Sequence, residues 1–551
     1  MSQNKSITEP PVAEAGPGLR DVRGHPGHDV IGAITGGLVL DGTGADPVAA
    51  TVLIDDGRIT ALLPAGAELL AHLDVIDARG NIVAPGFIDL HSHADFSMEA
   101  GPGAVTQLYQ GVTTLVTGNC GWSPFPITDL DQLRAGTAFL APEISWSWQD
   151  GAGFADALDS VGLAINIALQ VGHSALRLAV LGGAERAPSE AELERMKALL
   201  RDAADEGAVG LSTGLIYAPG TFAEPSEVAA LVATAAECGL LYSTHIRNEG
   251  VRLLEAIDEA IEAARAGGAR LQVSHLKAMG LANHGKVHAA LERMDQARAE
   301  GLDVACDVYP YTASSTTLTA RLPTWTMEGG TGGLLARLGH TTERSKVLDA
   351  VRQQAILDPE NVVVASLPPG RYEECRGLSL AEIGRRDGVD GAEAALRVLE
   401  NHQAAVSVVN HGMSEDDLVA VLRHPWTSVA SDGWILRATG EGHPHPRSFG
   451  TFPRVLGRYA RDEAVLTLPE AVRRMTSLPA SRLGMDDRGV VKPGAVADLV
   501  VLDPERVADR STYDEPWQLS VGIEHVLVAG KPVLRDGVPT SNRPGRVLRK
   551  T

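Results

Sequence analysis

Residues of the types that bind metal ions follow apolar, strand-like runs at five widely separated places in the chain. They are His91 with His93, Cys120, His245, His275 and Asp432. Imidazole, thiolate and carboxylate groups are the ligands that zinc takes in proteins. In a (β/α)8 barrel the carboxyl ends of the parallel strands meet at one rim, so ligands far apart in sequence can converge there. The pattern therefore predicts a metal site at the mouth of such a barrel.

The segment PGFIDLHSHAD carries two of these histidines, and other histidines follow later runs. Alternate side chains of an extended segment point to the same side, so His91 and His93 could grip one cation. His245 in LLYSTHIRNE and His275 in LQVSHLKAMG each precede polar residues suited to a rim loop. A single histidine after a strand is more often structural, and it is the recurrence that favours metal binding. His173 in LQVGHSALR also falls on the expected rim and could contact a substrate.

Cys120 and Asp432 complete the candidate set. Cys120 ends TTLVTGNCG, where Gly118 and Gly121 allow a tight turn and close backbone approach. Burial as a small packing residue is the alternative for this thiol. Asp432 in SVASDGW is the candidate general base for a metal-bound water, and the alternative is a carboxylate that caps the turn before Gly433.

Between about residues 82 and 484, strand-like runs alternate with amphipathic helices rich in Ala, Glu and Arg, which is typical of a parallel βα architecture. The eight strand candidates are GFIDLHSH, TTLVTGNC, INIALQVGHS, AVGLSTGL, LLYSTHIR, LQVSHLK, LDVACDVYP and TSVASDG. Eight parallel strands close a barrel. The stretch from about 312 to 425, which separates the seventh and eighth candidates, is too long for one connection and predicts an inserted subdomain with a strand at NVVVAS.

Short alternating strands with Gly-containing turns occur on both sides of this region. Residues 30–81 contain ITGGLVLDGTG and ATVLIDDGRITALL, which predict hairpins, and residues 485–551 have the same texture in GVVKPGAVADLVVLDP. The fold class is therefore α/β, with a (β/α)8 TIM-like barrel and a small β-sandwich domain formed by the N- and C-terminal segments. Residues 1–29 are expected to form a flexible arm.

Composition excludes several classes of partner. With 48 basic and 70 acidic residues in 551, the formal charge of −22 would repel the phosphate backbone of a nucleic acid. The four cysteines show no CxxC pairing, which indicates reduced thiols and a cytoplasmic location. No apolar run reaches the roughly 18 residues of a membrane span, and the chain start lacks the pattern of a signal peptide. We expect a small-molecule partner, and the oligomeric state stays open.

Taken in order, these motifs resemble those of the amidohydrolase superfamily, whose members are metal-dependent hydrolases built on a (β/α)8 barrel. Many members bridge two metals with a carboxylated lysine on the fourth strand, but AVGLSTGLIYAPG contains no lysine. The segments GNCG, STHIRNE, SHLK, DVYPYTASST, SDG and HPHPRSFGTFPRVLG instead resemble the N-acyl-D-amino-acid deacylase (D-aminoacylase) family, in which a cysteine takes over metal ligation. The resemblance covers nearly the whole chain.

The resemblance implies a ligand set. Cys120, His245 and His275 would hold one tightly bound zinc ion, and His91 and His93 would form a second, weaker site.

The resemblance also implies a reaction, the hydrolysis of an N-acyl-D-amino acid to a carboxylate and a free D-amino acid. Zinc would lower the pKa of a water, and Asp432 would take its proton and return it to the departing amine. The α-carboxylate would be bound by four side chains, Lys277, Tyr309, Ser315 and Arg447. Their ammonium, phenol, hydroxyl and guanidinium groups can each donate a hydrogen bond to a carboxylate. Surface solvation is the alternative for the lysine and the arginine.

The sequence offers two alternatives for the pocket that binds the substrate side chain. Arg321 in TTLTARLPTW could pair with an acidic side chain, whereas Leu322, Pro323 and Trp325 beside it would suit an apolar pocket. We favour the apolar pocket at this point. The preference for D over L substrates rests on the resemblance alone.

Two other functions remain open. The first is a cyclic-amide hydrolase, hydantoinase-like or dihydroorotase-like, on the same scaffold, against which Cys120 and the missing lysine count. The second is a catalytically dead barrel kept as a binding module, in which the metal-site residues are typically lost.

Overall fold

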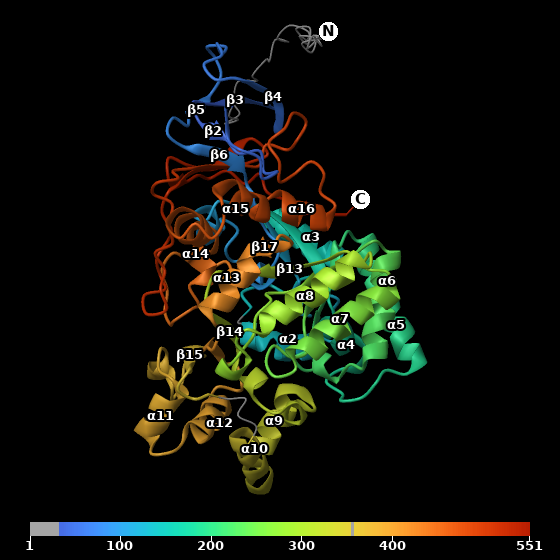
Figure 1. Cartoon of the computed structure of the whole chain (residues 1–551). Coiled ribbons are helices and arrows are strands. Elements are labelled where there is room, and N and C mark those ends of the chain that lie inside the picture. Colours follow the sequence, from blue (N-terminus) through green and yellow to red (C-terminus); the bar gives the residue numbers. More distant parts are fainter. Residues whose placement is uncertain (1–31, 141, 354–357, 551) are drawn as a thin grey trace, which may run out of the picture.

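The computed structural model describes residues 32–140, 142–353 and 358–550, and its centre is a ring of parallel strands (Figure 1). The strands follow one another around the ring in sequence order: β7 (Phe87–Asp89), β8 (Val112–Thr117), β9 (Asn166–Gly172), β10 (Gly210–Gly214), β11 (Leu241–His245), β12 (Leu271–Val273), β13 (Val304–Val308) and β17 (Thr427–Val429). A parallel bridge from Ser92 to Gly433 closes the ring between its first and last strands. The eight predicted strands and the barrel are confirmed.

Helices cover the outside of the ring, because their apolar faces pack against strands that are buried on both sides. After β7 to β12 come α1 (Val105–Leu108), α2 (Leu130–Thr137), α3 (Gly151–Val161), α4 (His173–Leu181), α5 (Glu190–Asp205), α6 (Pro225–Glu237), α7 (Leu253–Gly267) and α8 (Lys286–Ala299). Around and after β17 lie α13 (Glu415–Arg423), α14 (Arg447–Arg454), a π-helix (Val455–Asp462), α15 (Leu468–Met475) and α16 (Ser477–Leu483). In α5, Ser189 and Glu192 form a capping box that fixes the start of the helix.

The two ends of the chain pair in a second sheet at one end of the molecule (Figure 1). Its strands are β1 (Ala33–Thr35), β2 (Leu38–Val39), β3 (Val48–Asp55), β4 (Arg58–Pro64), β5 (Val75–Asp77), β6 (Ile82–Pro85), β18 (Leu499–Leu502), β19 (Ile523–Val528), β20 (Lys531–Arg535) and β21 (Val538–Pro539). The strands β6 and β18 are antiparallel neighbours, which joins the N- and C-terminal parts. Two of the expected antiparallel hairpins are present, as β2 with β3 and β3 with β4. The strands β1 and β2 within ITGGLVLDGTG do not pair with each other, because both pair with β3.

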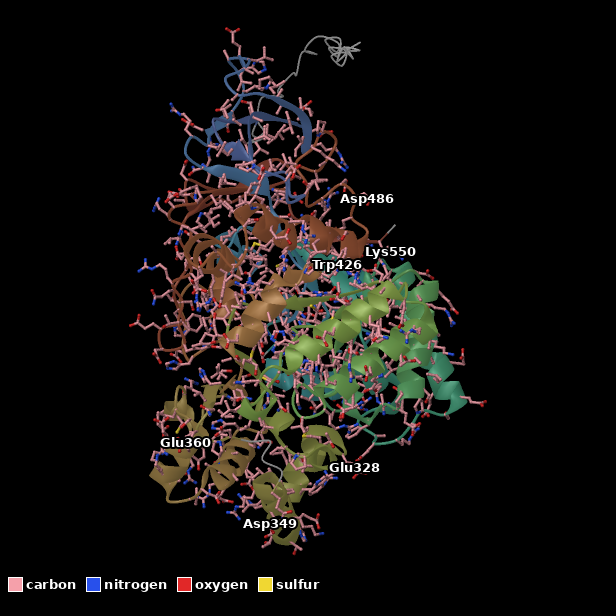
Figure 2. The ribbon with its side chains drawn as sticks, in the orientation of Figure 1. Glu328, Asp349, Glu360, Trp426, Asp486 and Lys550 are labelled. Atoms are coloured by element: carbon pink, nitrogen blue, oxygen red, sulfur yellow. The ribbon has the colours of Figure 1, made fainter. Side chains whose placement is uncertain are left out.

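The C-terminal tail pairs with the barrel and not with this sheet, so the β-domain ends earlier than the expected residue 551. Strand β22 (Val547–Leu548) pairs in parallel with β9, where Val547 lies opposite Ile167. Lys550 donates a backbone hydrogen bond of 3.0 Å to the carbonyl of Gly207, and Figure 2 places its side chain beside the barrel helices. The tail therefore fills the space beside β9 in a part of the strand that β10 does not cover.

An inserted subdomain lies at the opposite end of the molecule from the β-domain (Figure 1). It contains α9 (Gly330–Gly339), α10 (Thr341–Gln353), α11 (Leu380–Asp387), α12 (Gly391–Asn401) and a three-stranded sheet of β14 (Ala313–Thr317), β16 (Ser407–His411) and β15 (Val362–Ser366), in that order. The strand expected at NVVVAS is present as β15. The other two strands of this sheet were not anticipated, and β14 in particular is rich in Ser and Thr and lacks an apolar alternation.

The expected N-terminal arm and the expected cellular location are not tested by the described residues. The flexible arm of residues 1–29 lies outside the described residues. No helix in the described part of the chain combines the length and apolar character that crossing a bilayer requires. The cytoplasmic location stays a prediction.

Ending the chain before Gly545 should lower the melting temperature. The truncation removes the pairing of β22 with β9 and the contact of Lys550 with Gly207. We expect a fall of about 2 °C in a calorimetric scan, since the loss of a few hydrogen bonds and a buried valine costs roughly 2 kcal/mol and the unfolding entropy of a chain this long is roughly 1.2 kcal/mol/K. A chain that ends at Lys550 is the control and should melt like the full chain. Equal melting temperatures for the two truncations would contradict this role of the tail.

Candidate metal centre and active site

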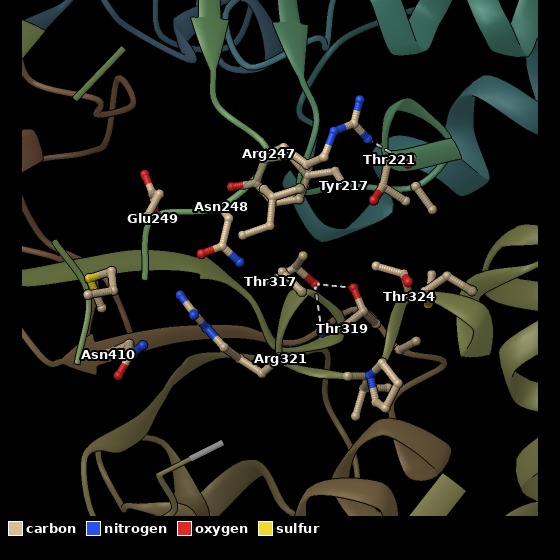
Figure 3. Close-up of a pocket in the computed structure, with 18 of the residues that line it drawn as sticks. Tyr217, Thr221, Arg247, Asn248, Glu249, Thr317, Thr319, Arg321, Thr324 and Asn410 are labelled. Carbon is tan, nitrogen blue, oxygen red and sulfur yellow. Dashed lines mark hydrogen bonds between the residues drawn. The ribbon is translucent and has the colours of Figure 1, made fainter. Parts of the chain in front are cut away.

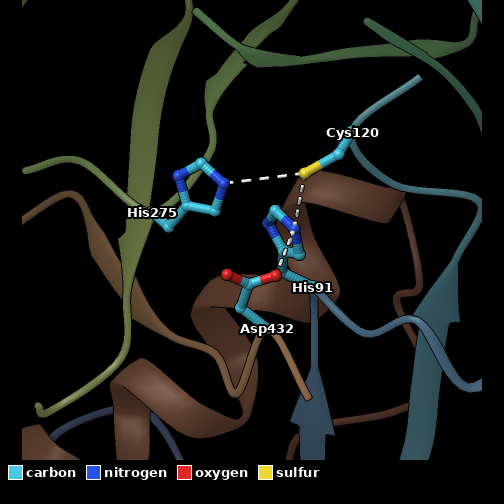
Figure 4. Close-up of side chains that lie close together, drawn as sticks. All are labelled: His91, Cys120, His275 and Asp432. Carbon is cyan, nitrogen blue, oxygen red and sulfur yellow. Dashed lines mark hydrogen bonds and ion pairs between the residues drawn. The ribbon is translucent and has the colours of Figure 1, made fainter. Parts of the chain in front are cut away.

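Four of the candidate ligands meet at the carboxyl ends of the barrel strands. One ligand atom from each of His91, Cys120, His275 and Asp432 lies within 4.8 Å of the others, and all four residues are buried (Figure 4). They come from the ends of β7, β8, β12 and β17, which the barrel brings to one rim. A second group of this kind, His245, Glu249 and His275, shares one histidine with the first.

The loop that carries Cys120 is held in an unusual backbone conformation. Cys120 has a φ of 54°, and Gly118 and Gly121 on either side each have a φ of 78°. A Cβ at Gly118 would lie 2.0 Å from the carbonyl oxygen of Gln170, so only glycine fits there. On β10, a Cβ at Gly214 would lie 2.0 Å from the carbonyl oxygen of Cys120. The fourth strand thus carries glycine where the cysteine loop approaches.

The distances within the cluster fit a zinc ion. Zinc binds thiolate sulfur at about 2.3 Å and imidazole nitrogen at about 2.0–2.1 Å, and tetrahedral angles then separate sulfur from nitrogen by roughly 3.5 Å. Cys120 Sγ lies 3.3 Å from His91 Nε2, 3.6 Å from His245 Nδ1 and 3.6 Å from His275 Nε2. A soft thiolate with buried imidazoles is also the donor set that zinc favours.

The thiol of Cys120 is held in its ionised form. Burial alone raises its pKa, but attraction to His91 and hydrogen bonds with His245 and His275 outweigh burial, so the pKa falls well below its ordinary value. The other wholly buried thiol on a barrel strand behaves in the opposite way, because burial raises the pKa of Cys306 to about 12. A thiolate is the form that ligates metal, so Cys120 is prepared for that role.

Two buried carboxylates stand behind the imidazoles. Asp307 Oδ1 lies 3.2 Å from His91 Nδ1, which leaves Nε2 of that ring facing the thiolate. Glu249 Oε1 lies 3.3 Å from His275 Nδ1 and 3.4 Å from His245 Nε2. Carboxylates in this position orient metal-binding histidines and select their tautomer. Neither acid was singled out from the sequence, although Glu249 follows His245 by four residues.

His93 lies beside the group of four rather than within it. Its Nε2 is 3.1 Å from Asp432 Oδ1, and its ring stacks on Trp434 with the centroids 5.3 Å apart. Burial lowers the pKa of His93, but the hydrogen bonds and charges of Asp432 and Cys120 together outweigh burial, and the pKa rises to about 9. The two histidines of the HSH motif therefore share Asp432, because His91 Nε2 lies 3.3 Å from Asp432 Oδ1 as well as 3.3 Å from Cys120 Sγ. They differ in their other neighbours, which are Asp307 for His91 and Trp434 for His93.

Asp432 forms an ion pair with the candidate carboxylate anchor. Arg447 Nη1 lies 2.7 Å from Asp432 Oδ2, and both side chains are buried. Burial raises the pKa of Asp432, but the charges of Arg447 and His91 outweigh it, so the carboxyl pKa lies well below its ordinary value. Asp432 is therefore ionised at neutral pH, as a proton acceptor must be.

The four candidate anchors line one small pocket together with all of the candidate metal ligands except His91. Lys277 and Arg447 are 4% and 1% exposed, so the alternative of surface solvation is wrong for both. The two cationic groups flank the ring of Tyr309, at 5.6 Å and 4.9 Å from its centroid. Arg447 also donates a 3.2 Å hydrogen bond to the carbonyl oxygen of Ser315, and its Nε has no hydrogen-bond partner among the described residues.

Lys277 is the anchor most involved with the cluster. Its ammonium group donates to Glu249 and lies 2.8 Å from His275 Nδ1. Because this cation adjoins a candidate ligand, a change at Lys277 would affect the metal as well as the substrate.

Other parts of the rim differ from expectation. His173 does not reach the pocket, because it is buried with its Nε2 2.8 Å from Glu227 Oε1. Tyr217 was not anticipated, yet its ring lies 5.0 Å from that of His245 and lines the pocket. Its position in LSTGLIYAPG, after the fourth strand, is the signal that could have found it.

Comparisons with known proteins agree with this arrangement. The Amidohydrolase family model matches residues 74–534. The N-acyl-D-glutamate deacylase of Alcaligenes xylosoxydans xylosoxydans is 40% identical over 94% of this chain and 96% of its own. The D-aminoacylase of the same organism is 33% identical over 94% and 97%. The crystal structure of N-acyl-D-glutamate deacylase from Bordetella bronchiseptica, complexed with zinc and a phosphonate inhibitor, has 39% identity and a TM-score of 0.81, covering 95% of this chain and 100% of that one.

Replacing Cys120 by alanine should abolish tight metal binding. The variant lacks the only ligand atom that lies within 3.6 Å of three imidazole nitrogens among the described residues. We expect zinc affinity to fall by at least about 100-fold, measured by metal analysis after dialysis against a chelator. Cys306→Ala, at a buried thiol outside the cluster, should keep its zinc. Stoichiometric zinc in Cys120→Ala would exclude this residue as a ligand.

Proposed function

Because the chain belongs to the amidohydrolase family, we propose that its barrel rim carries out one reaction, the zinc-dependent hydrolysis of N-acyl-D-amino acids. The chain is a metal-dependent deacylase of linear amides, which releases a carboxylate and a free D-amino acid. One observation carries this function. The sulfur of Cys120 is separated from the nitrogens of His245 and His275 by the distance expected between two ligands of one zinc ion, and the ionised Asp432 lies next to them.

The residues around the cluster supply the remaining chemistry. Zinc, when bound, polarises the amide carbonyl and makes water a stronger acid. Asp432 accepts the proton of the attacking water and passes it to the nitrogen of the departing amine. Arg447, Lys277 and Tyr309 bind the α-carboxylate and thereby fix the scissile bond relative to Asp432.

Substrate binding also prepares the base. In the free protein Arg447 is paired with Asp432, and this pairing lowers the proton affinity of the carboxylate. A substrate carboxylate at Arg447 shares the positive charge and weakens its pull on Asp432. The base then binds a proton more readily when a substrate is in place.

We further propose that the side-chain pocket accepts D-glutamate, in place of the apolar preference that the sequence favoured. Arg321 is 9% exposed and lines the pocket, and among the described residues no carboxylate forms an ion pair with it. Its Nε has no hydrogen-bond partner in the described part of the chain. A buried guanidinium without an acidic partner favours an anionic ligand. The similarity to N-acyl-D-glutamate deacylases supports the same choice.

A cyclic-amide hydrolase is the weaker alternative. Its representatives among the solved structures, such as D-hydantoinase at 17% identity and a TM-score of 0.54, share the fold alone. The fourth strand, β10, carries no lysine, and the cysteine loop packs against it.

Asp432→Asn should keep zinc and lose turnover. Asparagine is close in shape but cannot accept the proton, so kcat on N-acetyl-D-glutamate should fall by roughly 100- to 10,000-fold. Zinc content is measured in the same preparation. Asp417→Asn, at a buried carboxylate that accepts from the backbone of Gly285, is the control and should keep kcat within about twofold. Near-normal turnover with zinc in place would show that Asp432 is not the base.

A substrate panel tests the reaction and the side-chain preference together. The zinc protein is assayed on the N-acetyl derivatives of D-Glu, D-Asp, D-Leu, D-Met and L-Glu, and we expect the highest kcat/KM for D-Glu. Arg321→Gln should lower kcat/KM for D-Glu by roughly 10- to 100-fold, the value of a charge-assisted hydrogen bond, with little change for D-Leu. Arg186→Gln, at an exposed arginine, is the control. A wild-type preference for D-Leu or D-Met would overturn the choice of D-glutamate.

A further inference from the structure

A second and much larger cavity adjoins the pocket of the metal centre. Its volume is about 1100 Å³, compared with about 40 Å³ for the pocket at the metal centre. The two cavities share lining residues, among them Trp122, Tyr217, Glu249 and Arg321, so they are direct neighbours. Figure 3 shows barrel residues such as Tyr217 and Arg247 on one side of the larger cavity and Arg321 of the inserted segment on the other.

The size of this cavity exceeds the needs of an N-acetyl amino acid. Sites for drug-sized ligands usually have volumes of about 300–1000 Å³. An acetyl group is two carbon atoms long and would leave almost all of the larger cavity filled by water. The structure therefore provides room for a part of the substrate that the proposed reaction has not yet used.

The lining of the cavity suits an apolar chain of variable length. Met279, Met327 and Met413 are three of the nine methionines in the sequence, and methionine adapts its shape to differing ligands. The two most exposed large hydrophobic residues in the described part of the chain, Leu281 at 85% and Val251 at 73%, both line this cavity. Single exposed apolar residues are common, but two on neighbouring loops of one cavity form an apolar lip.

Most charged groups at the cavity are already paired. Among the described residues the exceptions are Arg321 and Asp358, whose carboxylate accepts a hydrogen bond from the side-chain amide of Asn361 and forms no ion pair. The guanidinium of Arg247 forms hydrogen bonds of 2.8–3.1 Å with both oxygens of Glu259. Glu249 accepts from the ammonium of Lys277. Apart from Arg321 and Asp358, the described lining carries no unpaired carboxylate or guanidinium group, which favours an uncharged occupant over most of the cavity.

The three substituents of an N-acyl amino acid indicate which part of the substrate occupies the larger cavity. The α-carboxylate is assigned to Arg447 and the side-chain carboxylate to Arg321, so the acyl group is the third arm that leaves the scissile amide. We propose that the larger cavity is an acyl subsite that accepts long, unbranched fatty acyl groups, so that the enzyme cleaves N-fatty-acyl D-amino acids in preference to N-acetyl ones. This inference rests on the proposed function.

The test compares acyl chains on one amino acid. N-acetyl-, N-butanoyl-, N-octanoyl- and N-dodecanoyl-D-glutamate are assayed with the zinc protein below their critical micelle concentrations. Each methylene that becomes fully buried is worth about fourfold, so kcat/KM for the octanoyl substrate should exceed that for the acetyl substrate by at least about 30-fold. An octanoyl to acetyl ratio of one or less would overturn the inference.

Variants locate the effect in the cavity. Leu281→Asp and Met327→Asp place a charge on the apolar path and should lower the octanoyl to acetyl ratio by at least about tenfold. Val538→Glu, at a residue 63% exposed on the β-domain, is the matched control and should leave the ratio unchanged. An unchanged ratio in both cavity variants would show that the chain binds elsewhere.

Two further measurements separate the possible failures. N-acetyl-D-glutamate γ-octylamide carries the same chain on the side chain, and a gain for this compound instead of the N-octanoyl one would overturn the assignment of the acyl arm. Loss of all hydrolysis would contradict the proposed function but not the cavity. Calorimetric titration of the zinc-loaded Asp432→Asn variant then decides, since N-octanoyl-D-glutamate should bind at least about 30-fold more tightly than N-acetyl-D-glutamate, and equal affinities would reject the acyl subsite.

Discussion

A buried thiolate is costly unless positive charge or hydrogen-bond donors surround it, and this constraint governs the rim of the barrel. Cys120 is 3% exposed, and three imidazole nitrogens lie within 3.6 Å of its sulfur. The imidazoles need their own acceptors, which Asp307 and Glu249 provide. Glu249 in turn is balanced by Lys277. Each charged group of the cluster is thus next to a group of opposite charge. A divalent cation that binds at the centre would displace protons from the imidazoles and the thiol.

The backbone carries a cost to hold this cluster together. Cys120, His275 and Asp432 all have positive φ values, of 54°, 35° and 50°, a region in which residues other than glycine are uncommon. Such positions cost about 1–3 kcal/mol each and persist only where surrounding structure holds them. The hydrogen bond from the backbone N–H of Asp432 to the carbonyl of His91, at 2.8 Å, supplies part of that support and also closes the barrel.

The barrel and the inserted subdomain contribute different residues to the candidate active site. The candidate metal-binding and proton-transfer groups lie at the carboxyl ends of barrel strands, and they need fixed separations, which sites built on strands and helices hold more precisely than sites on loops. The insertion contributes Ser315 and Arg321 and closes the larger cavity against the barrel loops. Arg447, at the start of α14, touches both parts, through Asp432 on one side and the carbonyl of Ser315 on the other.

The sequence by itself determined the eight strands, their order and the residue types at their ends, because apolar periodicity and alternation with helices are local patterns. It also placed Cys120, the histidines and Asp432 after those strands. The tertiary structure decided which atoms face one another, why Glu249 and Asp307 stand behind the imidazoles, where β22 pairs, and that Arg321 lacks an acidic partner among the described residues. These contacts join residues far apart in the chain, so no local pattern encodes them, and they exist only once the barrel and its insertion have packed together.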